Sequence, residues 1–113
     1  MPKRSKLTFE ECLSLMRKRD PQLAEDGFHF LRSGAKEHLP RLLEAFRTEE
    51  IHSIRCWLLE LIGEARSEDA FAVLCEQAVS SDESLRNWGV IGLELLDTKA
   101  SRTFLFENKL KLE

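Results

Sequence analysis

Hydrophobic residues recur every three or four positions along most of the chain, in short segments separated by glycine, proline, aspartate and serine. This spacing places them on one side of an α-helix, and no stretch alternates for long enough to build a sheet. Connections of a few residues make successive helices antiparallel. The pattern therefore predicts an all-α fold. The expected helices are residues 9–19, 21–33, 35–47, 49–63, 67–79, 82–96 and, more briefly, 100–107.

The first two helices have clear start signals. Thr8 and Glu11 have the spacing of a capping box, in which each side chain binds the backbone N–H of the other residue. Asp20 and Pro21 suit the next start, because aspartate is a good N-cap and proline loses no helical hydrogen bond at the first position.

Glycine and proline mark further features. Gly34 is expected to end the second helix in the left-handed conformation. Pro40 lies inside the third segment, so that helix either begins close to the proline or is kinked there. Gly89 and Gly92 lie within the sixth segment, where glycine costs about 1 kcal/mol relative to alanine. Their presence favours the close approach of a neighbouring helix.

The sequence repeats itself at an offset of 31 residues, since Arg55-Cys56-Trp57 recurs as Arg86-Asn87-Trp88. Hydrophobic positions match at the same offset, and a weaker copy extends back to the first two helices. The matches are Leu42 with Val73, Leu43 with Leu74, Ile54 with Leu85, Leu59 with Val90, Ile62 with Leu93 and, one step earlier, Leu23 with Ile54, Phe28 with Leu59 and Leu31 with Ile62. A fixed period predicts a short α-solenoid of about three antiparallel helix pairs, in which each pair is buried against its neighbours, plus a short C-terminal capping helix.

The segment 38–43, His-Leu-Pro-Arg-Leu-Leu, resembles the start of the first helix of a HEAT repeat, one of the armadillo-like repeats. The fourth and sixth predicted helices are similar to its second helix, and each carries an arginine at the same place. The resemblance covers about residues 21–106 and implies a HEAT-like helical repeat protein. In that family the second-helix arginine commonly pairs with an acidic residue of the preceding turn or neighbouring repeat. This implies structural roles for Arg55 and Arg86.

Composition adds limits to this picture. The chain has 113 residues, 42% of them hydrophobic and 33% charged, which suits one globular domain. We expect a flexible N-terminus at 1–7, a single HEAT-like repeat domain at 8–107 and a tail at 108–113. The net charge of −3 argues against nucleic acid as a partner, because proteins that bind phosphates usually carry a basic surplus. One basic cluster is read as a solvated end: Lys3, Arg4 and Lys6.

The three cysteines, Cys12, Cys56 and Cys75, are scattered and never form a CxxC pair. An odd, scattered set predicts reduced, mostly buried thiols in a cytoplasmic protein. No segment approaches the ~18 apolar residues of a membrane span, so we expect no membrane association.

The sequence contains no phosphate-binding glycine motif, no HExxH and no close set of four zinc ligands. Cys56 and His52 are four residues apart, but we place them on the solvent-facing side of the fourth helix and favour surface or packing roles over catalysis. Glu49 and Glu50 are expected at a helix start, where acidic residues suit the dipole. We expect no catalytic residue, no metal and no cofactor.

Aromatic residues are expected to be structural. Trp57 and Trp88 could anchor a partner, but their identical place in two units favours packing between helix pairs. The run Phe-Leu-Phe at 104–106 is expected to cap the open end of the stack. The alternative is an exposed end through which a monomer forms a weak dimer.

The outward side of the second helices, which are expected to start at Pro21, Glu49 and Asp82, is polar and acidic and is left for a partner. The candidate contacts are Glu25, Asp26, His29, Glu49, His52, Ser53, Cys56, Glu60, Glu83 and Asn87. Our hypothesis is a non-catalytic protein–protein interaction module that binds another, basic protein.

Other functions stay open. The chain could be an immunity protein that neutralises a basic toxin such as a nuclease. It could be a HEAT-like nucleic-acid binder or glycosylase, although that function needs a basic groove and this face is acidic. It could also be a lyase-like or chaperone-like factor, for which Cys56 would be the residue to test.

Overall fold

The computed structural model describes residues 7–110, and over this range every regular element is helical. The all-α prediction is therefore confirmed. Lys3, Arg4 and Lys6, nearly all of the expected flexible terminus and the last three residues of the tail lie outside the described residues. The elements are α1 (Phe9–Met16), α2 (Pro21–Ser33), α3 (Ala35–Thr48), α4 (His52–Glu64), the short 3-10 helix η1 (Glu68–Ala70), α5 (Phe71–Ala78), α6 (Glu83–Leu96) and α7 (Lys99–Glu107).

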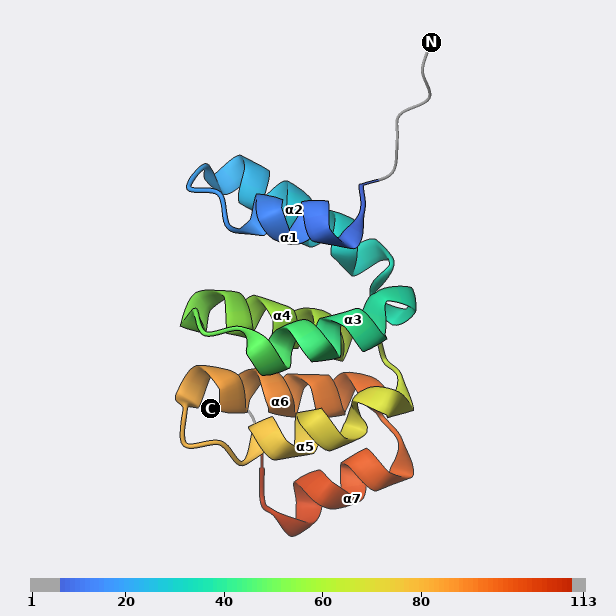
Figure 1. Cartoon of the computed structure of the whole chain (residues 1–113). Coiled ribbons are helices and arrows are strands. Elements are labelled where there is room, and N and C mark those ends of the chain that lie inside the picture. The colour runs from blue at the N-terminus through green and yellow to red at the C-terminus, as the bar shows by residue number, and fades with distance from the viewer. Residues whose placement is uncertain (1–6, 111–113) are drawn as a thin grey trace.

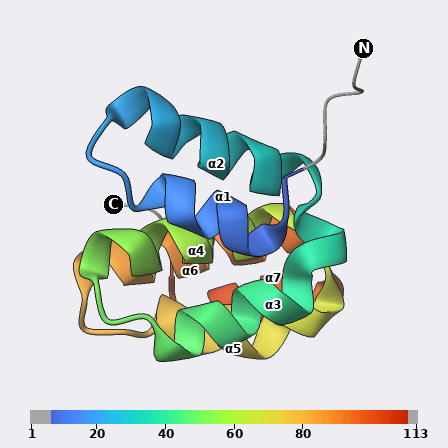
Figure 2. The ribbon, with the colours of Figure 1, turned by 45° about the horizontal axis from the view of Figure 1, so that its top comes forward.

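The helices form a solenoid-like stack of antiparallel neighbours (Figure 1). α1 packs on α2, α3 on α4, and α5 on α6, while α7 packs on the far side of α6 as the last layer. α4 and α6 pack closely and lie side by side in both views of the ribbon (Figures 1 and 2). The structure thus has the three predicted pairs and a short final helix, with α2, α4 and α6 as the second helices.

The predicted start signals are present. The Thr8 hydroxyl accepts from the Glu11 N–H at 3.0 Å, and the Glu11 carboxylate accepts from the Thr8 N–H at 2.8 Å. Asp20 caps α2 by accepting from the Gln22 N–H at 2.9 Å, and Pro21 is the first residue of that helix. These side chains satisfy backbone donors that the first turn of a helix leaves without a partner.

Gly34 and Pro40 differ from expectation. Gly34 has a φ of −121°, so the predicted left-handed conformation is wrong. This residue is both the C-cap of α2 and the N-cap of α3, so no separate turn lies between the two helices. α3 runs from Ala35 through Pro40 without a break in its assignment, so the helix does not begin at the proline. The first half of α3 therefore follows α2 with a single residue between them.

Positions related by the 31-residue offset are buried in both units. Leu59 and Val90 are 0% and 1% exposed, and Ile62 and Leu93 are both 0% exposed. The exceptions are Leu43, which is half-buried although its counterpart Leu74 is buried, and Leu23, which is 40% exposed although its counterpart in α4 is buried. Leu23 belongs to the first pair, which has a neighbour on one side only.

Glycines allow the central helices to touch. A Cβ on Gly63 of α4 would lie 2.9 Å from the Gly92 Cα of α6. A Cβ on Gly89 of α6 would lie 2.6 Å from the backbone nitrogen of Ala78 in α5. The close approach predicted from Gly89 and Gly92 is confirmed, and it holds α6 against both α4 and α5.

Both tryptophans pack against the core, as predicted. Trp57 is half-buried, and its ring centroid lies 5.1 Å from that of Phe28 in α2, so it joins the first pair to the second. Trp88, at the matching place in α6, is also half-buried against the core.

α7 closes the stack with only part of its aromatic run. Phe104 packs edge-on against Phe71 of α5, with 6.5 Å between ring centroids, and Leu105 is half-buried. Phe106 is 84% exposed, so the expectation that the whole run caps the stack is wrong for this residue. Ser101, Phe104 and Leu105 occupy the inward side of α7, and Phe106 lies on the other side of the helix.

Candidate functional site

The ten predicted contact residues lie on or beside the second helices. We call the outward side of α2, α4 and α6 the second-helix face. The exposed members are Glu25, His29, His52, Ser53 and Glu83, and the half-buried members are Asp26, Glu49, Cys56, Glu60 and Asn87. All except Glu49 lie within these three helices, so the predicted set is largely brought to one side of the stack.

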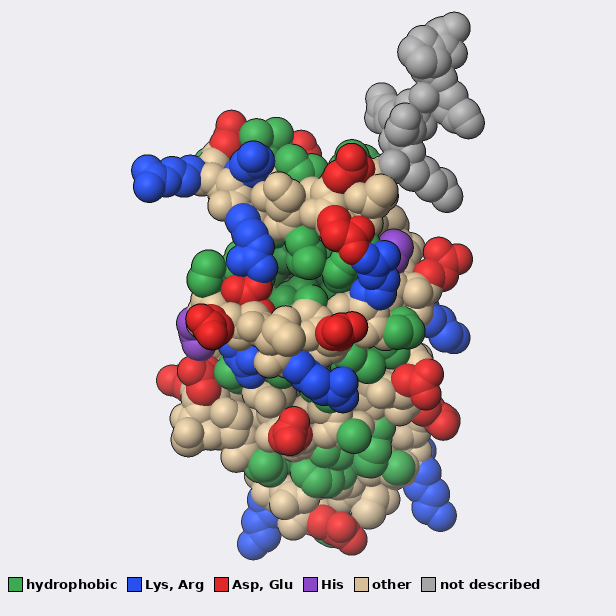
Figure 3. Space-filling view, in the orientation of Figure 1, with side chains coloured by type: hydrophobic (Ala, Val, Ile, Leu, Met, Phe, Trp, Pro, Cys, Tyr) green, Lys and Arg blue, Asp and Glu red, His purple; other side chains and the backbone are tan. Residues whose placement is uncertain are grey.

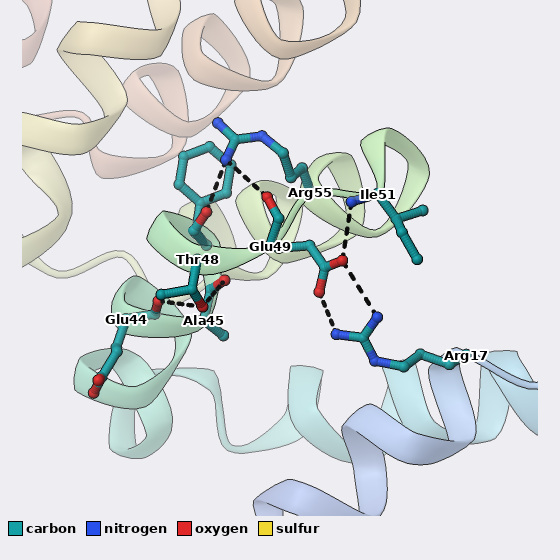
Figure 4. Close-up of polar contacts among 8 residues, drawn as sticks. Arg17, Glu44, Ala45, Thr48, Glu49, Ile51 and Arg55 are labelled. Carbon is teal, nitrogen blue, oxygen red and sulfur yellow. Dashed lines mark hydrogen bonds and ion pairs between the residues drawn. The ribbon is translucent and has the colours of Figure 1, made fainter.

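Glu49 does not belong to the second-helix face. α3 extends to Thr48 and α4 begins at His52, later than predicted, so Glu49 lies in the turn between them. There its carboxylate pairs with Arg17 and accepts from the Ile51 N–H at 3.0 Å (Figure 4). The hydrogen bond from Arg17, with help from the Ile51 N–H, lowers the pKa of this carboxyl, whose side chain is 7% exposed. Glu49 is therefore a structural link between the first two pairs.

Arg55 and Arg86 also have structural contacts. Arg55 Nη1 donates to the carbonyl oxygens of Phe46 at 2.8 Å and Glu49 at 3.3 Å, and its guanidinium lies 4.1 Å from the Phe46 ring centroid (Figure 4). Arg86 Nη1 donates to the Ser80 carbonyl at 3.1 Å, six residues back, as Arg55 does to Glu49. These bonds go to main-chain oxygens in or just before the turn that precedes each second helix. Each arginine thus closes the turn of its own helix pair.

His52, Cys56 and Asp82 meet where α4 begins beside the start of α6. His52 Nε2 lies 2.8 Å from Asp82 Oδ2, and Cys56 Sγ lies 3.8 Å from the same nitrogen. Burial, and then the nearby Asp82 carboxylate, raise the pKa of the Cys56 thiol. Asp82 caps α6 by accepting from the Leu85 N–H at 2.9 Å, and this bond first, then His52, lowers its pKa. The raised pKa disfavours the Cys56 thiolate, and the imidazole nitrogen closest to Sγ is the one that pairs with Asp82.

Glu60 lies at the middle of the second-helix face, one turn before Glu64 on α4. Burial, and then the Glu64 carboxylate, raise the pKa of Glu60, while Arg32 and His29 of α2 act in the opposite direction. Arg32 Nη2 pairs with Glu64 Oε2 at 3.5 Å, so this cation is engaged mainly by the neighbouring carboxylate. Glu60 is left half-buried, without an ion pair of its own among the described residues.

Three members of this surface were missed from the sequence: Arg32, Glu64 and Asp82. The spacing of four residues between Glu60 and Glu64 was a visible signal that two carboxylates share one helix side. The other contacts join different helix pairs, as in the pairing of His52 with Asp82. They depend on the register with which one pair stacks on the next, and hydrophobic spacing does not specify that register.

Within residues 7–110, no group of three or more histidine, cysteine, aspartate or glutamate side chains is placed to hold a metal ion. None of the described helices combines the length and apolarity that crossing a membrane requires. Comparison with known protein families, with curated proteins and with solved structures finds no match to this chain.

Proposed function

We propose that this chain is a HEAT-like, non-catalytic protein-binding module of the cytoplasm, and that its second-helix face receives a basic partner protein. The observation that carries the proposal is Glu60. This carboxyl is half-buried beside Glu64, and its pKa is raised by burial first and by that neighbour second. The folded chain would therefore be more stable without the charge. A charge that costs stability is typical of a functional surface.

The surroundings of Glu60 support the same partner chemistry. Glu25 on α2 and Glu83 on α6 are exposed on the same side of the stack, one helix to either side of α4. A cationic side chain placed over Glu60 would relieve its repulsion from Glu64 and gain from both exposed carboxylates. Such a face speeds association with a basic protein and disfavours an acidic one.

The non-catalytic part of the proposal rests on Cys56 and His52. The thiol is held protonated, and the imidazole nitrogen closest to it is engaged with Asp82. This also weighs against a lyase-like role for Cys56. Replacement of Cys56 by serine keeps a small polar side chain at this place on the second-helix face, so partner binding is expected to persist, whereas a lyase-like activity would be lost.

The test measures binding of an oligolysine peptide to the full chain by titration calorimetry at low and at high salt. We expect binding that weakens as salt rises, because the charges are exposed. The triple variant Glu25→Lys, Glu60→Lys, Glu83→Lys should raise the dissociation constant about tenfold or more, which corresponds to ~1.4 kcal/mol. The matched control makes the same change in net charge away from this face, with Glu44→Lys on α3, Glu68→Lys on η1 and Glu76→Lys on α5, all at exposed positions.

Equal losses in the triple variant and in the control would show that only net charge matters, and the proposed face would be wrong. Retardation of duplex DNA by the wild-type chain at low salt would favour the nucleic-acid alternative instead.

A narrower form of the proposal is an immunity protein whose partner is a basic toxin. The charge of the second-helix face suits such a partner, but so would any basic protein. The specific test is co-purification of the chain with the product of the neighbouring reading frame, followed by the same triple variant. A tight complex that survives the triple variant would exclude this face as the toxin-binding surface.

A further inference from the structure

The two ends of the stack carry exposed aromatic residues that the proposed partner-binding face does not use. An interior layer is covered by neighbours on both sides, as α4 is by α2 and α6. The first pair and α7 have a neighbour on one side only. Phe30 of α2 is 45% exposed and Phe106 of α7 is 84% exposed. The end layers of a stack of repeats normally have a polar outer face. An exposed aromatic ring at each end is therefore a feature that needs an explanation.

The C-terminal end presents a basic stripe around its ring. Lys99, Arg102, Thr103 and Phe106 are spaced three and four residues apart, so they share one side of α7, and all four are exposed. Lys109 follows directly, and its side chain has no ion pair among the described residues. Arg102 is engaged with Asp97 at 2.8 Å. We call this stripe, with Lys109, the tail face.

The tail face also has an apolar surround. Ala100, Phe104 and Phe71 line a hollow of about 540 Å³ on one flank of α7, and Figure 3 shows hydrophobic side chains gathered over α5 and α7. Leu105 and Leu110 line a second hollow of about 560 Å³ on the other flank. Glu107 and Glu94 lie along these flanks rather than on the outer stripe.

The N-terminal end presents an acidic counterpart. Phe30 lies between two hollows of about 290 and 330 Å³. Asp26 lines the first and Glu37 lines the second, so a carboxylate stands on each side of the ring. We call Phe30, Asp26 and Glu37, with Ser33 between the hollows, the head face.

We infer that the tail face of one copy docks on the head face of a second copy, so that the chain self-associates head to tail. Phe106 would enter a hollow beside Phe30, with Lys99 and Lys109 opposite Asp26 and Glu37. A tail-to-tail dimer would bring the lysines of both copies together, and a head-to-head dimer would bring the carboxylates together. Opposite charges around the two exposed rings therefore favour the head-to-tail pairing. Such a pair still has one free head face and one free tail face, so further copies can add at either end.

The test is sedimentation velocity of the full chain over a concentration series at low salt. The wild type is expected to grow in size with concentration and to dissociate as salt rises. A tail variant, Phe106→Ser with Lys109→Glu, and a head variant, Phe30→Ser with Asp26→Lys, should each stay monomeric, with an apparent dissociation constant raised about tenfold or more. The matched control is Val79→Ser, which removes a 55% exposed side chain from the turn after α5 and should leave association unchanged.

Mixing distinguishes the pairings. The tail variant keeps a normal head and the head variant keeps a normal tail, so an equimolar mixture should form one-to-one dimers and stop there. Circular dichroism of each variant verifies that it is folded. A wild type that stays monomeric at every concentration overturns the inference, as does a head variant that still dimerises alone, since this would show tail-to-tail pairing. Binding of the wild-type tail to phosphatidylserine vesicles without self-association would assign the tail face to a lipid surface and would equally refute it.

Discussion

Single residues decide how the helices of this chain end, and where the backbone turns left-handed they are not glycines. Within residues 7–110, three non-glycine residues have positive φ: Arg66 at 49°, Asp97 at 53° and Lys109 at 55°. Each follows or closes a helix, and Lys109 lies in a Schellman arrangement, since its N–H donates to Phe106 and the Leu110 N–H donates to Leu105. A left-handed conformation costs about 1 kcal/mol or more for such residues, and glycine would adopt it freely.

Replacement of Arg66 by glycine is expected to stabilise the chain by about 0.5–1 kcal/mol, because the left-handed strain exceeds the entropy that glycine adds to the unfolded chain. Arg66 is exposed and follows the end of α4. Urea unfolding of Arg66→Gly measures the effect, with Arg66→Ala as control, since alanine keeps the strain. An equal gain in both variants would assign the effect to charge rather than to backbone conformation.

A second prediction at the residue scale concerns Glu60. Its pKa is raised in the folded state, by burial first and then by Glu64, so the folded chain binds the proton more tightly than the unfolded chain. Ionised Glu60 therefore lowers stability above its folded pKa, and this penalty disappears as pH falls and the carboxyl is protonated. Glu60→Gln should raise the stability at pH 7 by about 0.5 kcal/mol, or roughly 2–4 °C in Tm.

The gain from Glu60→Gln should shrink towards zero at acid pH, where both proteins carry a neutral side chain. Thermal unfolding of Glu60→Gln and wild type from pH 7 downwards measures the difference. The exposed Glu76→Gln on α5 is the matched control and should change Tm little at any pH. A gain that is constant with pH would contradict the assigned cause.

At the scale of the elements, glycine sets the distance between the central helices. Gly63 of α4 and Gly92 of α6 leave no room for a Cβ: one on Gly92 would meet Leu74 Cδ2 at 2.5 Å and the Gly63 Cα at 3.3 Å. Alanine would favour each helix by about 1 kcal/mol, but forcing it into this contact costs about 1–3 kcal/mol. Packing therefore outweighs helix propensity at these two positions.

Gly63→Ala and Gly92→Ala are each expected to destabilise the chain by about 1–2 kcal/mol in urea unfolding. The methyl added at Gly63 separates α4 from α6, and the one added at Gly92 displaces mainly the buried Leu74 side chain of α5. The control is Gly34→Ala. A Cβ there would have no neighbour closer than His38 Cδ2 at 3.4 Å, and φ is not left-handed, so that variant should be neutral or slightly stabilising. Stabilisation by Gly63→Ala would contradict the direct contact between α4 and α6 at this glycine.

Elements were predictable from the sequence to the extent that their signals are local. The capping box at Thr8, the proline start at Pro21 and the burial pattern of α4 and α6 each follow from residues a few positions apart. Gly34 misled because a glycine suggests a left-handed end, while the residues that do have positive φ include Arg66 and Lys109, whose identity does not mark them. Asp97 is the exception, since aspartate adopts the left-handed conformation more readily than most residues. Glu49 misled because an acidic residue at a helix start and one in a turn look alike.

At the scale of the whole molecule, the stack is held together unevenly. α6 packs on α4 and α5 with little space between backbones. The first pair meets the rest through ring contacts of Phe28 with Trp57 and of Phe9 with His38, and through ion pairs. The ion pairs between the first helix pair and the second are Arg17 with Glu49, Arg41 with Glu10 and Arg32 with Glu64. Figure 3 shows a hollow with hydrophobic side chains at its base between the first pair and the second. The first pair is therefore expected to be the least stable part.

Hydrogen exchange should show this difference, with amides of α1 and α2 exchanging faster than those of α4 and α6. Acid pH should increase this difference in exchange rate between the first pair and the central helices. The pKa of Glu49 is lowered in the folded state, chiefly by Arg17, so its stabilising contribution is complete above the unfolded pKa and is lost as pH falls through the folded one. Exchange measured at falling pH tests this, with Arg17→Ala as a variant that should already exchange fast in α1 and α2 at neutral pH. Uniform protection across all pairs would contradict the prediction.

The acidic character of the candidate site could be predicted from the sequence, but the contacts between its side chains could not. The polar, acidic character of the second helices follows from their sequence, and nine of the ten predicted residues lie within these helices. The links of Glu49 to Arg17, of His52 to Asp82 and of Arg32 to Glu64 join different helix pairs. Such links arise only when the pairs are stacked, so no pattern within one helix announces them.

The arginine contacts that close each turn have a consequence for how the chain reaches this structure. Arg55 and Arg86 bind carbonyl oxygens only six residues back, and the helices of a pair follow each other directly in sequence. Most of the early ordering can therefore happen without closing long loops. Proteins rich in such local contacts fold on the order of milliseconds or faster. A nascent chain could complete one pair before the next is synthesised, so that each finished pair serves as the surface on which the following one condenses.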